Sequence, residues 1–447
     1  ARELHLAGIA TAIWSPFERH KPLTAAHLRH ALWLGVPRLG HPPAPDGLEL
    51  WIDALLGIGQ QRSPGEAIET LLAARQRARP QQLVAVDVPT GLCADSGRLL
   101  GSAAACAHTT YTLGLRKSGL VQDTALAWVG TLQQIELGLP PALLEGLPQS
   151  QPLGLHPADL AALPPLALDP AAGKYGRGRL LLVAGSDRYR GAAALALLGA
   201  DASGCGSLQA ALPEAVAGEL WRWLPHAVLA QSLASDGAGH LRLADLAAAH
   251  LERLDALLVG PGLGCGNATT AEAPEERGSW QRLQAFPGLL VLDADGLNRL
   301  TAPWLSQRRG PTWITPHAGE FARLFPQLAD QPPLEAAGNA AKESGAVVLL
   351  KGAHTVIAAP DGRRWQLLET TAETARTGLG DVLAGYAAGL GARAMAGGAN
   401  GDACWLAAAA LAHANAGLHL HNKGVVSSPE RIAARLQTAH PMAATSR

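Results

Sequence analysis

The sequence is poor in cysteine and in net charge, and it has no long apolar run. A formal net charge of −1 gives it no overall field that would attract nucleic acid or an anionic membrane. No apolar run approaches the roughly 20 residues that span a bilayer, and no signal peptide is visible. The cysteines are odd in number and never in C-x-x-C spacing, which argues against a disulfide framework or zinc site and favours reduced thiols in a cytoplasmic protein. They are Cys93, Cys106, Cys205, Cys265 and Cys404.

Methionine is also scarce. The sequence opens on Ala1, and its only methionines are Met395 and Met442. Residues 1–8 read as a helix that an earlier strand and turn would precede, so we expect that the true start is missing. A length of 447 residues favours two or three domains, and a hydrophobic fraction of 48% suffices for large cores.

The first third of the chain alternates strand-like and helix-like patterns. Strands are expected at residues 48–52 and 83–88, and a Pro-Thr-Gly turn follows the second at residues 89–91. Apolar strands separated by helical stretches indicate a mostly parallel sheet covered on both faces. Ligand-binding residues of such sheets gather at the carboxyl ends of strands, where Asp53 and Asp87 stand.

A second α/β pattern follows a proline-rich segment, residues 146–172, which we expect to be a linker. Polar or glycine-rich turns follow consecutive strands of this pattern, which predicts one long cleft able to hold a large phosphorylated ligand. The strands are expected at 180–185, 256–260, 289–293 and 347–351, with a helix at 192–202. The turns are at 260–264, 293–298, 315–320 and 351–355.

The strongest single motif is the Gly-Leu-Gly-Asp turn at residues 378–381, which runs into an Ala/Leu/Gly-rich helical pattern. Glycines let successive backbone N–H groups point at one anion, and the dipole of the following helix adds positive potential. A carboxylate in such a turn is electrostatically awkward unless it moves a proton during phosphate chemistry or elimination. Asp381 is therefore the leading catalytic candidate; the alternative is an acid that only stabilises a helix N-terminus.

In this order the motifs resemble those of two joined families. Residues 173–440 resemble the ribokinase-like NAD(P)H-hydrate dehydratases, and residues 1–145 resemble the NAD(P)H-hydrate epimerases. The resemblance implies a Rossmann-like three-layer αβα domain followed by a ribokinase-like α/β domain. The dehydratase motifs are residues 174–178, 191–193, 260–264, 315–320, 351–355 and 378–381. The epimerase motifs are residues 53–57, 87–92 and 114–120.

The resemblance implies an enzyme that repairs NADH and NADPH after hydration of the nicotinamide ring. The dehydratase half would remove water from the S hydrate at the expense of ADP, or of ATP, with Mg²⁺ as a further cofactor and a homo-oligomer as the assembly. Asp381 would be the acid/base, and Ala192, Gly264 and His317 would line the hydrate site. The nucleotide would be held by Lys351, Gly352, Ala353, His354, Thr355, Gly378 and Gly380.

The epimerase half would interconvert the R and S hydrates. The resemblance makes Asp53 and Thr90 ligands of K⁺, and makes Asp87 the residue that binds or deprotonates the hydrate. Relatives carry an Asn-rich phosphate loop just before the point where this sequence begins, so we expect this half to be impaired. The hydrate would also contact Gly57, Ile58, Gly59, Gln60, Gln61, Arg62 and Ser63.

Two residues near the strongest motif depart from the pattern of the relatives. Leu379 stands where relatives have a small or hydroxyl residue, and Arg376 stands where they have Thr or Ser. Arg376 could add a contact to an anion or could crowd the site. These departures favour a second hypothesis, in which the chain is a binding protein whose catalytic sites have drifted.

A kinase activity also fits the residues by themselves. A small-molecule kinase for a hydroxymethyl substrate would share the Gly-x-Gly-Asp turn and the ribokinase-like fold. Asp293 and Asp295 fit a binding role and a loop-capping role equally, because aspartate at a strand end also caps turns. His419 and His421 have no carboxylate or cysteine close by in sequence, so we expect them to be structural rather than metal ligands.

Overall fold

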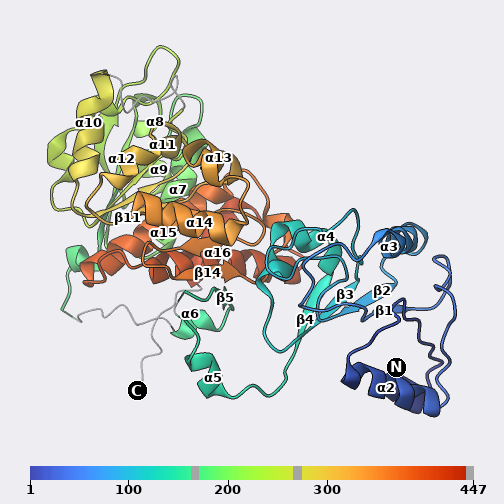
Figure 1. Cartoon of the computed structure of the whole chain (residues 1–447). Coiled ribbons are helices and arrows are strands. Elements are labelled where there is room, and N and C mark those ends of the chain that lie inside the picture. The colour runs from blue at the N-terminus through green and yellow to red at the C-terminus, as the bar shows by residue number, and fades with distance from the viewer. Residues whose placement is uncertain (149, 163–170, 265–273, 439–447) are drawn as a thin grey trace. The chain divides into compact units, whose positions relative to one another are not determined.

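The chain forms two compact units, Ala1–Gly146 and Leu147–Arg447 (Figure 1). The computed structural model describes residues 1–148, 150–162, 171–264 and 274–438. None of the helices in these ranges is both long and apolar enough to cross a membrane. Cys265 lies outside the described residues, and the other four cysteines are free thiols.

The first unit is built on a parallel sheet of four strands, which lie in chain order: β1 (Trp51–Asp53), β2 (Leu83–Val86), β3 (Thr109–Leu113) and β4 (Thr131–Ile135). Helix α3 (Glu66–Ala78) packs Ile68 and Leu72 against Leu83 and Ala85 of β2. A second small apolar core lies around Val88 and the turns after β3. The other elements are α1 (Arg2–Leu6), α2 (Pro22–Trp33), η1 (Ser118–Val121), η2 (Asp123–Ala125), α4 (Leu126–Val129) and α5 (Pro141–Glu145).

A buried arginine ties helix α3 to the start of the sheet. Arg75 is 1% exposed, and its guanidinium lies 4.6 Å from the ring centre of Trp51 in β1. Burial lowers the pKa of Arg75, yet the guanidinium is well supplied with acceptors. It donates to the backbone carbonyls of Pro45, Gly47, Glu49 and Gln82. Since the loop at residues 45–49 leads into β1, this arginine fixes the strand that ends at Asp53.

The second unit contains a ten-stranded sheet. Its strands are parallel to their neighbours except β13, which is antiparallel to both strands beside it. From edge to edge they are β5 (Leu153–Leu155), β14 (Arg364–Leu367), β13 (Val356–Ala358), β12 (Val347–Leu350), β11 (Thr312–Ile314), β10 (Leu289–Leu292), β9 (Ala256–Val259), β6 (Arg179–Val183), β7 (Ser207–Pro213) and β8 (Val228–Leu233). The carboxyl ends of β12, β11, β10, β9 and β6 therefore meet along one edge of the sheet.

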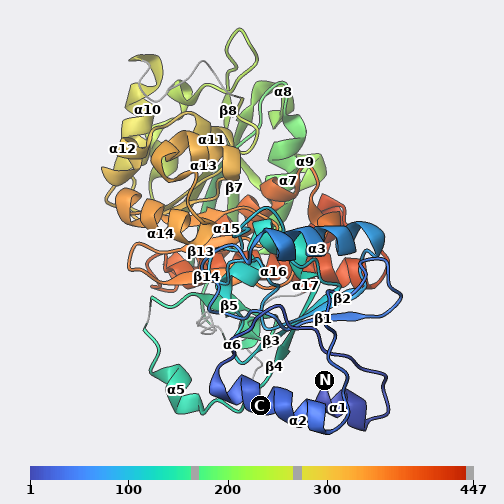
Figure 2. The same ribbon diagram turned by 45° about the vertical axis from the view of Figure 1, so that its right-hand side comes forward.

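Helices cover both faces of this sheet (Figure 2). Side chains of each strand alternate between the two cores: Leu258 and Val291 belong to one, and Leu257 and Leu290 to the other. The first core is closed by α7 (Arg190–Ala202), α15 (Leu379–Ala396), α16 (Ala403–Asn422), α17 (Pro429–Thr438) and the short α8 (Glu214–Ala217) and α9 (Leu220–Trp223). The second is closed by α10 (Pro274–Ala285), α11 (Asp295–Asn298), α12 (Ala302–Ser306), α13 (Ala318–Leu324) and α14 (Pro333–Ser344). The remaining short elements are α6 (Asp159–Ala162), η3 (Lys174–Arg177), η4 (Leu243–Asp245), η5 (Ala248–Leu251), η7 (Pro326–Leu328) and η8 (Ala372–Thr374).

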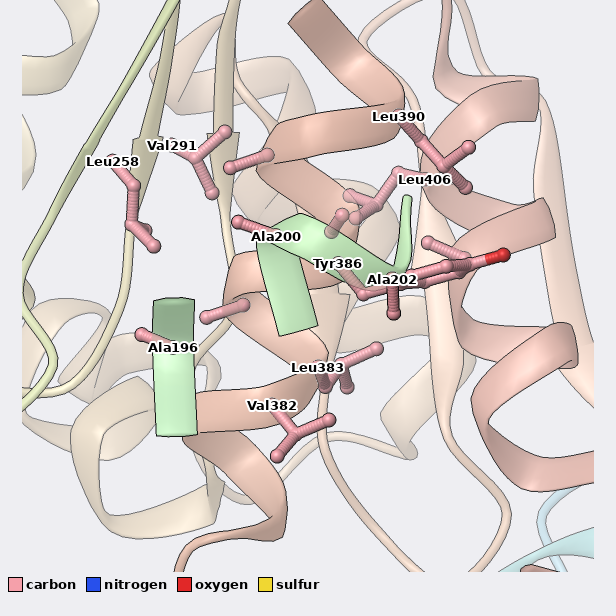
Figure 3. Packing of buried hydrophobic residues seen from close by; sticks show 14 of the residues in the cluster. Ala196, Ala200, Ala202, Leu258, Val291, Val382, Leu383, Tyr386, Leu390 and Leu406 are labelled. Carbon is pink, nitrogen blue, oxygen red and sulfur yellow. The ribbon is translucent and has the colours of Figure 1, made fainter. Parts of the chain in front are cut away.

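Helices α7 and α15 approach each other closely because glycines stand at their contact (Figure 3). A Cβ on Gly199 of α7 would collide with the carbonyl oxygen of Val382, and a Cβ on Gly385 of α15 would collide with that of Ala196. The glycines thus let the two backbones touch, at the cost of lower helix propensity. Because α15 begins at the Gly-Leu-Gly-Asp turn, this contact fixes where the turn lies.

The predicted fold class is confirmed, since both units are α/β with largely parallel sheets. Each apolar run that we expected to be a strand contains one, although β1 begins at Trp51 rather than at Leu48. The segment expected to be a linker, residues 146–172, is not wholly a connection, because part of it belongs to the long sheet. It contributes β5, which pairs with β14 at the edge of the long sheet, while its residues 149 and 163–170 lie outside the described ones.

Candidate active site

The turn before α15 brings backbone N–H groups and one carboxylate to the same place. Gly378 caps the helix with a φ of +89°, a left-handed conformation that residues with a side chain rarely adopt. A Cβ on Gly378 would also lie 2.5 Å from Cδ1 of Leu195. Gly380 and Asp381 follow in the first helical turn, whose N–H groups have no carbonyl partner within the helix. The turn can therefore donate to an anion beside Asp381.

The two residues that depart from the expected motif contribute to packing behind the turn. The Leu379 side chain is 4% exposed and belongs to the core between the sheet and α7. The guanidinium of Arg376 donates to the carbonyl oxygen of Ser427 at 3.1 Å, in the connection between α16 and α17. His413 of α16 hydrogen-bonds the backbone of Leu379, and burial lowers the pKa of this histidine to about 4. The turn is thus held by α16 and by the chain that follows it.

A buried ion pair lies across the carboxyl ends of three neighbouring strands. Asp293 follows β10 and is 1% exposed, and its Oδ1 lies 2.8 Å from Nζ of Lys351, which follows β12. Thr315, which follows the intervening strand β11, donates its hydroxyl to the same Oδ1 at 2.7 Å. Nζ of Lys351 also lies 3.6 Å from the point where a Cβ on Gly380 would stand. The strand ends therefore place an ammonium group against the Gly-Leu-Gly-Asp turn.

Asp381 is electrostatically unusual within this group. Burial raises its pKa to about 7; the negative charges of Asp293 and Asp295 act in the same direction, and Lys351 opposes them. Burial disfavours the charge of Lys351, but Asp293, Glu320 and Asp381 together raise its pKa. One ammonium group is thus shared among several carboxylates. A carboxyl group that titrates near pH 7 is suited to act as a general base or acid at neutral pH.

His317 and Glu320 form a capping box at the start of α13. Nδ1 of His317 accepts from the N–H groups of Gly319 and Glu320, and the Glu320 carboxylate accepts from the N–H of His317 at 2.9 Å. The N–H of Lys351 bonds the carbonyl of Pro316 at 2.8 Å, so His317 lies beside the lysine. The His317 side chain is 61% exposed, which leaves its outer face accessible to a ligand.

The other residues predicted to hold a nucleotide differ in accessibility. Gly352 and Ala353 are exposed, whereas His354 and Thr355 are each 8% exposed. The hydroxyl of Thr355 donates to the carbonyl of Gly352 at 3.1 Å, and therefore closes the turn itself. Within residues 351–355, Gly352 and Ala353 are the exposed members, and the Lys351 side chain is 22% exposed.

Two of the three residues predicted to line the hydrate site, Ala192 and Gly264, lie at the glycine-rich turn after β9. A Cβ on Gly262 would lie 2.6 Å from the Cβ of Ala192, which is in the first turn of α7. The N–H of Gly264 bonds Oδ2 of Asp295 at 2.8 Å, and the guanidinium of Arg299 donates to the carbonyl of Gly264 at 2.7 Å. Because Asp295 also influences the pKa of Asp381, the turn belongs to the same site.

In the first unit the two predicted K⁺ ligands bond each other. Asp53 accepts from the N–H and from the hydroxyl of Thr90, both at 2.7 Å, and is 5% exposed. Burial raises the pKa of Asp53. Gln60 is also buried, and its side chain binds the turn after β2 through the N–H of Gly91 at 2.7 Å and the carbonyl of Pro89 at 3.3 Å.

Asp87 occupies a left-handed backbone conformation, with a φ of +71°. Such a conformation costs on the order of 1 kcal/mol in a residue other than glycine, and it is common at functional sites. Its carboxylate accepts from the N–H of Ile58 at 3.1 Å and pairs with Nζ of Lys117 at 2.5 Å. Nζ of Lys117 also donates to the hydroxyl of Thr112 at 3.1 Å and to the carbonyl of Leu113 at 2.7 Å. The ammonium group is therefore held in one place against Asp87.

The remaining residues predicted to contact the hydrate in the first unit lie on one loop. Gly57 stands against Asp87: a Cβ there would lie 3.0 Å from Oδ2 of the aspartate. Ser63 bonds Glu69 at the other end of the loop, at 2.5 Å. Between these points the accessible members are Ile58, Gly59, Gln61 and Arg62.

Two residues of these sites and one pairing escaped the sequence prediction. Lys117 lies within a predicted motif but had no assigned role, and Arg299 carries no sequence signal at all. The pairing of Asp293 with Lys351 joins residues 58 positions apart, so only the sheet order shows it. His419 and His421 lie on α16, where neighbours two apart point to different faces. His421 contacts Glu373 at 3.3 Å, and the described residues contain no group of three or more His, Cys, Asp or Glu that could hold a metal ion.

Two family models match the chain, one on each unit. Residues 180–438 match the model of NAD(P)H-hydrate dehydratase, and residues 1–119 match the model of the YjeF-related protein N-terminus.

Individual proteins give a consistent result. The chain is 42% identical over 393 residues to a bifunctional NAD(P)H-hydrate repair enzyme of Gloeobacter violaceus, an alignment that covers 86% of this chain and 75% of the relative. It is 38% identical over 396 residues to the enzyme of the same name from Synechocystis, covering 87% and 73% of the two chains. Among solved structures it is similar to an ADP/ATP-dependent NAD(P)H-hydrate dehydratase from Bacillus subtilis co-crystallized with ATP and Mg²⁺. That match has a TM-score of 0.54 and 27% identity, and covers 65% of this chain and 98% of the other.

Proposed function

The chain belongs to the family of bifunctional NAD(P)H-hydrate repair enzymes, and from this premise we propose how its residues carry out the repair. The second unit dehydrates the S hydrate of NADH or NADPH with an adenine nucleotide, and the first unit interconverts the R and S hydrates. We propose ADP as the nucleotide. The net reaction of the second unit converts hydrate and ADP into NAD(P)H, AMP and inorganic phosphate.

The observation that carries the proposal is the position of Asp381. Its carboxyl group lies at a helix N-terminus, beside the ammonium of Lys351, and its pKa is raised to about 7 by burial and by neighbouring aspartates. At neutral pH it can take the proton from the hydroxyl of the hydrate as the hydroxyl oxygen attacks the terminal phosphoryl group. The bond between this phosphoryl group and AMP breaks as the new P–O bond forms. The C–O bond of the phosphorylated hydrate then breaks, inorganic phosphate leaves with that oxygen, and the nicotinamide ring releases a proton to solvent as its double bond forms.

The other groups of the site serve this reaction by binding. Lys351 and the N–H groups of the turn face the phosphates, because a positive charge and helix-terminal donors stabilise phosphate oxygens. The hydrate lies against Ala192, Gly264 and His317. Mg²⁺ would be carried by the nucleotide phosphates and would offset part of their negative charge.

The test is a dehydration assay on separated epimers. The wild type should regenerate NADH from the S hydrate when ADP is present and should leave the R hydrate unchanged until the first unit has converted it. Asp381→Asn should lower kcat by roughly 100-fold or more, as loss of a general base does. Asp361→Asn, which removes an exposed carboxylate paired with Arg363, is the matched control and should leave kcat unchanged. Full activity of Asp381→Asn would refute the assignment.

For the first unit we propose that Asp87 moves the proton of the hydrate and that K⁺ binds at Asp53 and Thr90. Hard oxygen ligands suit an alkali cation, and Asp53 is a buried carboxylate whose partners among the described residues are N–H and O–H donors rather than a cation. Asp53→Asn should therefore weaken the dependence of epimerisation on K⁺, whereas Asp87→Asn should abolish epimerisation at every K⁺ concentration. In both cases epimerisation is measured as the rate at which the R hydrate is converted into the S hydrate, which the second unit then dehydrates to NAD(P)H.

A further inference from the structure

Asp293 is buried in the second unit without an assigned role. Its carboxylate is 1% exposed, and burying an isolated charge is costly unless hydrogen bonds and an opposite charge compensate it. Both compensations are present: the ammonium of Lys351 at 2.8 Å and the hydroxyl of Thr315 at 2.7 Å reach the same oxygen, Oδ1. The aspartate is thus firmly held, and it in turn fixes the end of a long, flexible lysine side chain.

The place where the lysine is fixed matters for the reaction. Nζ of Lys351 lies 3.6 Å from the position of a Cβ on Gly380, the residue before Asp381. The positive charge of Lys351 lowers the pKa of Asp381, so an ammonium group free to approach this carboxylate would pair with it and hold it ionised. Asp293, at the end of β10, holds the same ammonium at 2.8 Å.

We propose that Asp293 is a positioning residue that keeps the Lys351 ammonium on its own carboxylate and so prevents Asp381 from being locked in a full ion pair. The inference rests on the proposed role of Asp381 as the group that moves the proton. In this arrangement Lys351 remains oriented toward the nucleotide phosphates, and Asp381 stays able to gain and lose a proton near neutral pH. Asp293 does not touch the reacting atoms; it acts through Lys351 and through its own charge.

The charged groups around Asp381 determine the expected signs. Asp293 and Asp295 face it from the end of β10 and raise its pKa, while Lys351 faces it from the end of β12 and lowers it. Glu320 of α13 also raises the pKa of Lys351, and His317, which lies 3.4 Å from Glu320, acts on that carboxylate. Removing the charge of Asp293 takes away one repulsion and also frees Lys351 to pair with Asp381. Both effects lower the pKa of Asp381.

The experiment is a set of pH profiles of kcat for dehydration of the S hydrate by the full chain with saturating ADP. If Asp381 acts as a base, the acidic limb of the profile reports its titration in the complex. Asp293→Asn should move this limb to lower pH by roughly 1 unit, the effect of one close charge, and should lower the plateau of kcat about tenfold or more through misplacement of Lys351. Lys351→Met should move the limb in the opposite direction, to higher pH.

Thr315→Val is the matched control. It removes a hydrogen bond from the same oxygen of Asp293 but leaves both charges in place, so its limb should stay at the wild-type pH. Should Asp293→Asn fold poorly, the double variant Asp293→Asn with Lys351→Met removes the whole pair without leaving a buried charge unpaired. Its limb should then lie between those of the two single variants.

The inference predicts that the acidic limb moves to lower pH in Asp293→Asn and to higher pH in Lys351→Met. If the limb moves in the same direction in both variants, or in neither, the inference is overturned, because a residue with only a structural role would not produce opposite shifts. The proposed function fails by a different result. If Asp381→Asn keeps its activity in the same assay, the catalytic assignment is wrong; if that variant is inactive and the limbs do not move, only the role of Asp293 is wrong.

Discussion

Replacing Asp381 by asparagine should make the protein more stable, and the gain should grow with pH. Burial and neighbouring aspartates raise the pKa of Asp381 from 3.8 to about 7. Between these values the folded protein keeps a proton that the unfolded chain has released. The free energy of unfolding therefore falls as pH rises from about 4 to about 7, and above pH 7 the full penalty remains.

The size of the effect follows from the shift. Each pKa unit corresponds to about 1.4 kcal/mol, so the raised pKa costs the folded state up to about 4 kcal/mol at pH 8, where Asp381 is ionised in both states, and about 1.5 kcal/mol at pH 5, where it is ionised only in the unfolded chain. Asp381→Asn should recover these amounts. The assay is urea denaturation of the full chain at pH 5 and pH 8, with the free energy of unfolding compared between variant and wild type.

Asp361→Asn is again the control, and its sign is opposite. Hydrogen bonds from Arg363 lower the pKa of Asp361, so its carboxylate stabilises the fold at pH values above its ordinary pKa, and this stabilisation is lost as pH falls through the lowered value. The exposed pair should contribute little, and its removal should destabilise slightly at both pH 5 and pH 8. If Asp381→Asn were equally stabilising at pH 5 and pH 8, or destabilising at pH 8, the electrostatic account of the site would be refuted.

Two further predictions concern how the site is held. Gly199→Ala should destabilise the second unit by about 1–3 kcal/mol, because the added Cβ would collide with the backbone of α15. Its kcat should also fall, since Asp381 would be displaced. Gly218→Ala is the control: a Cβ there meets nothing within 4 Å, so stability and kcat should not change. Equal melting temperatures for these two variants would contradict the packing argument. Arg299→Met should raise the KM for the hydrate more than it lowers kcat, because the carbonyl of Gly264 loses two donated hydrogen bonds; a change in kcat alone would place Arg299 outside the binding site.

The central strands of the long sheet could be predicted from sequence because their burial is complete. β9, β10 and β12 are continuous apolar runs, as is β6 after Arg179, and a strand covered on both faces must be apolar on both. The strands at the margins escaped prediction for the converse reason. β8 carries exposed and half-buried side chains along most of its length, and two of the four residues of β14 are the polar Arg364 and Gln366, so neither has the pattern of a buried strand.

The candidate site was predictable where a residue type is tied to a local backbone requirement. Gly378 has a left-handed φ, which favours glycine. An aspartate that follows such a glycine turn at the start of a helix either moves a proton or stabilises the helix N-terminus. What sequence could not give is which side chains meet. The pairing of Asp293 with Lys351 depends on β10, β11 and β12 being adjacent, and that of Asp87 with Lys117 depends on the turn after β3. The orientation of Leu379 into the core likewise depends on the closeness of α7 and α15.

The central claim is that the hydroxyl of the hydrate attacks the nucleotide beside Asp381. It is tested most directly by preparing the S hydrate with ¹⁸O in that hydroxyl and following the label during turnover with ADP. The account predicts that the label appears in inorganic phosphate, and that Asp381→Asn forms neither labelled phosphate nor NADH. Label released into water while ADP is hydrolysed would show that dehydration and nucleotide cleavage are separate events, and would contradict the account.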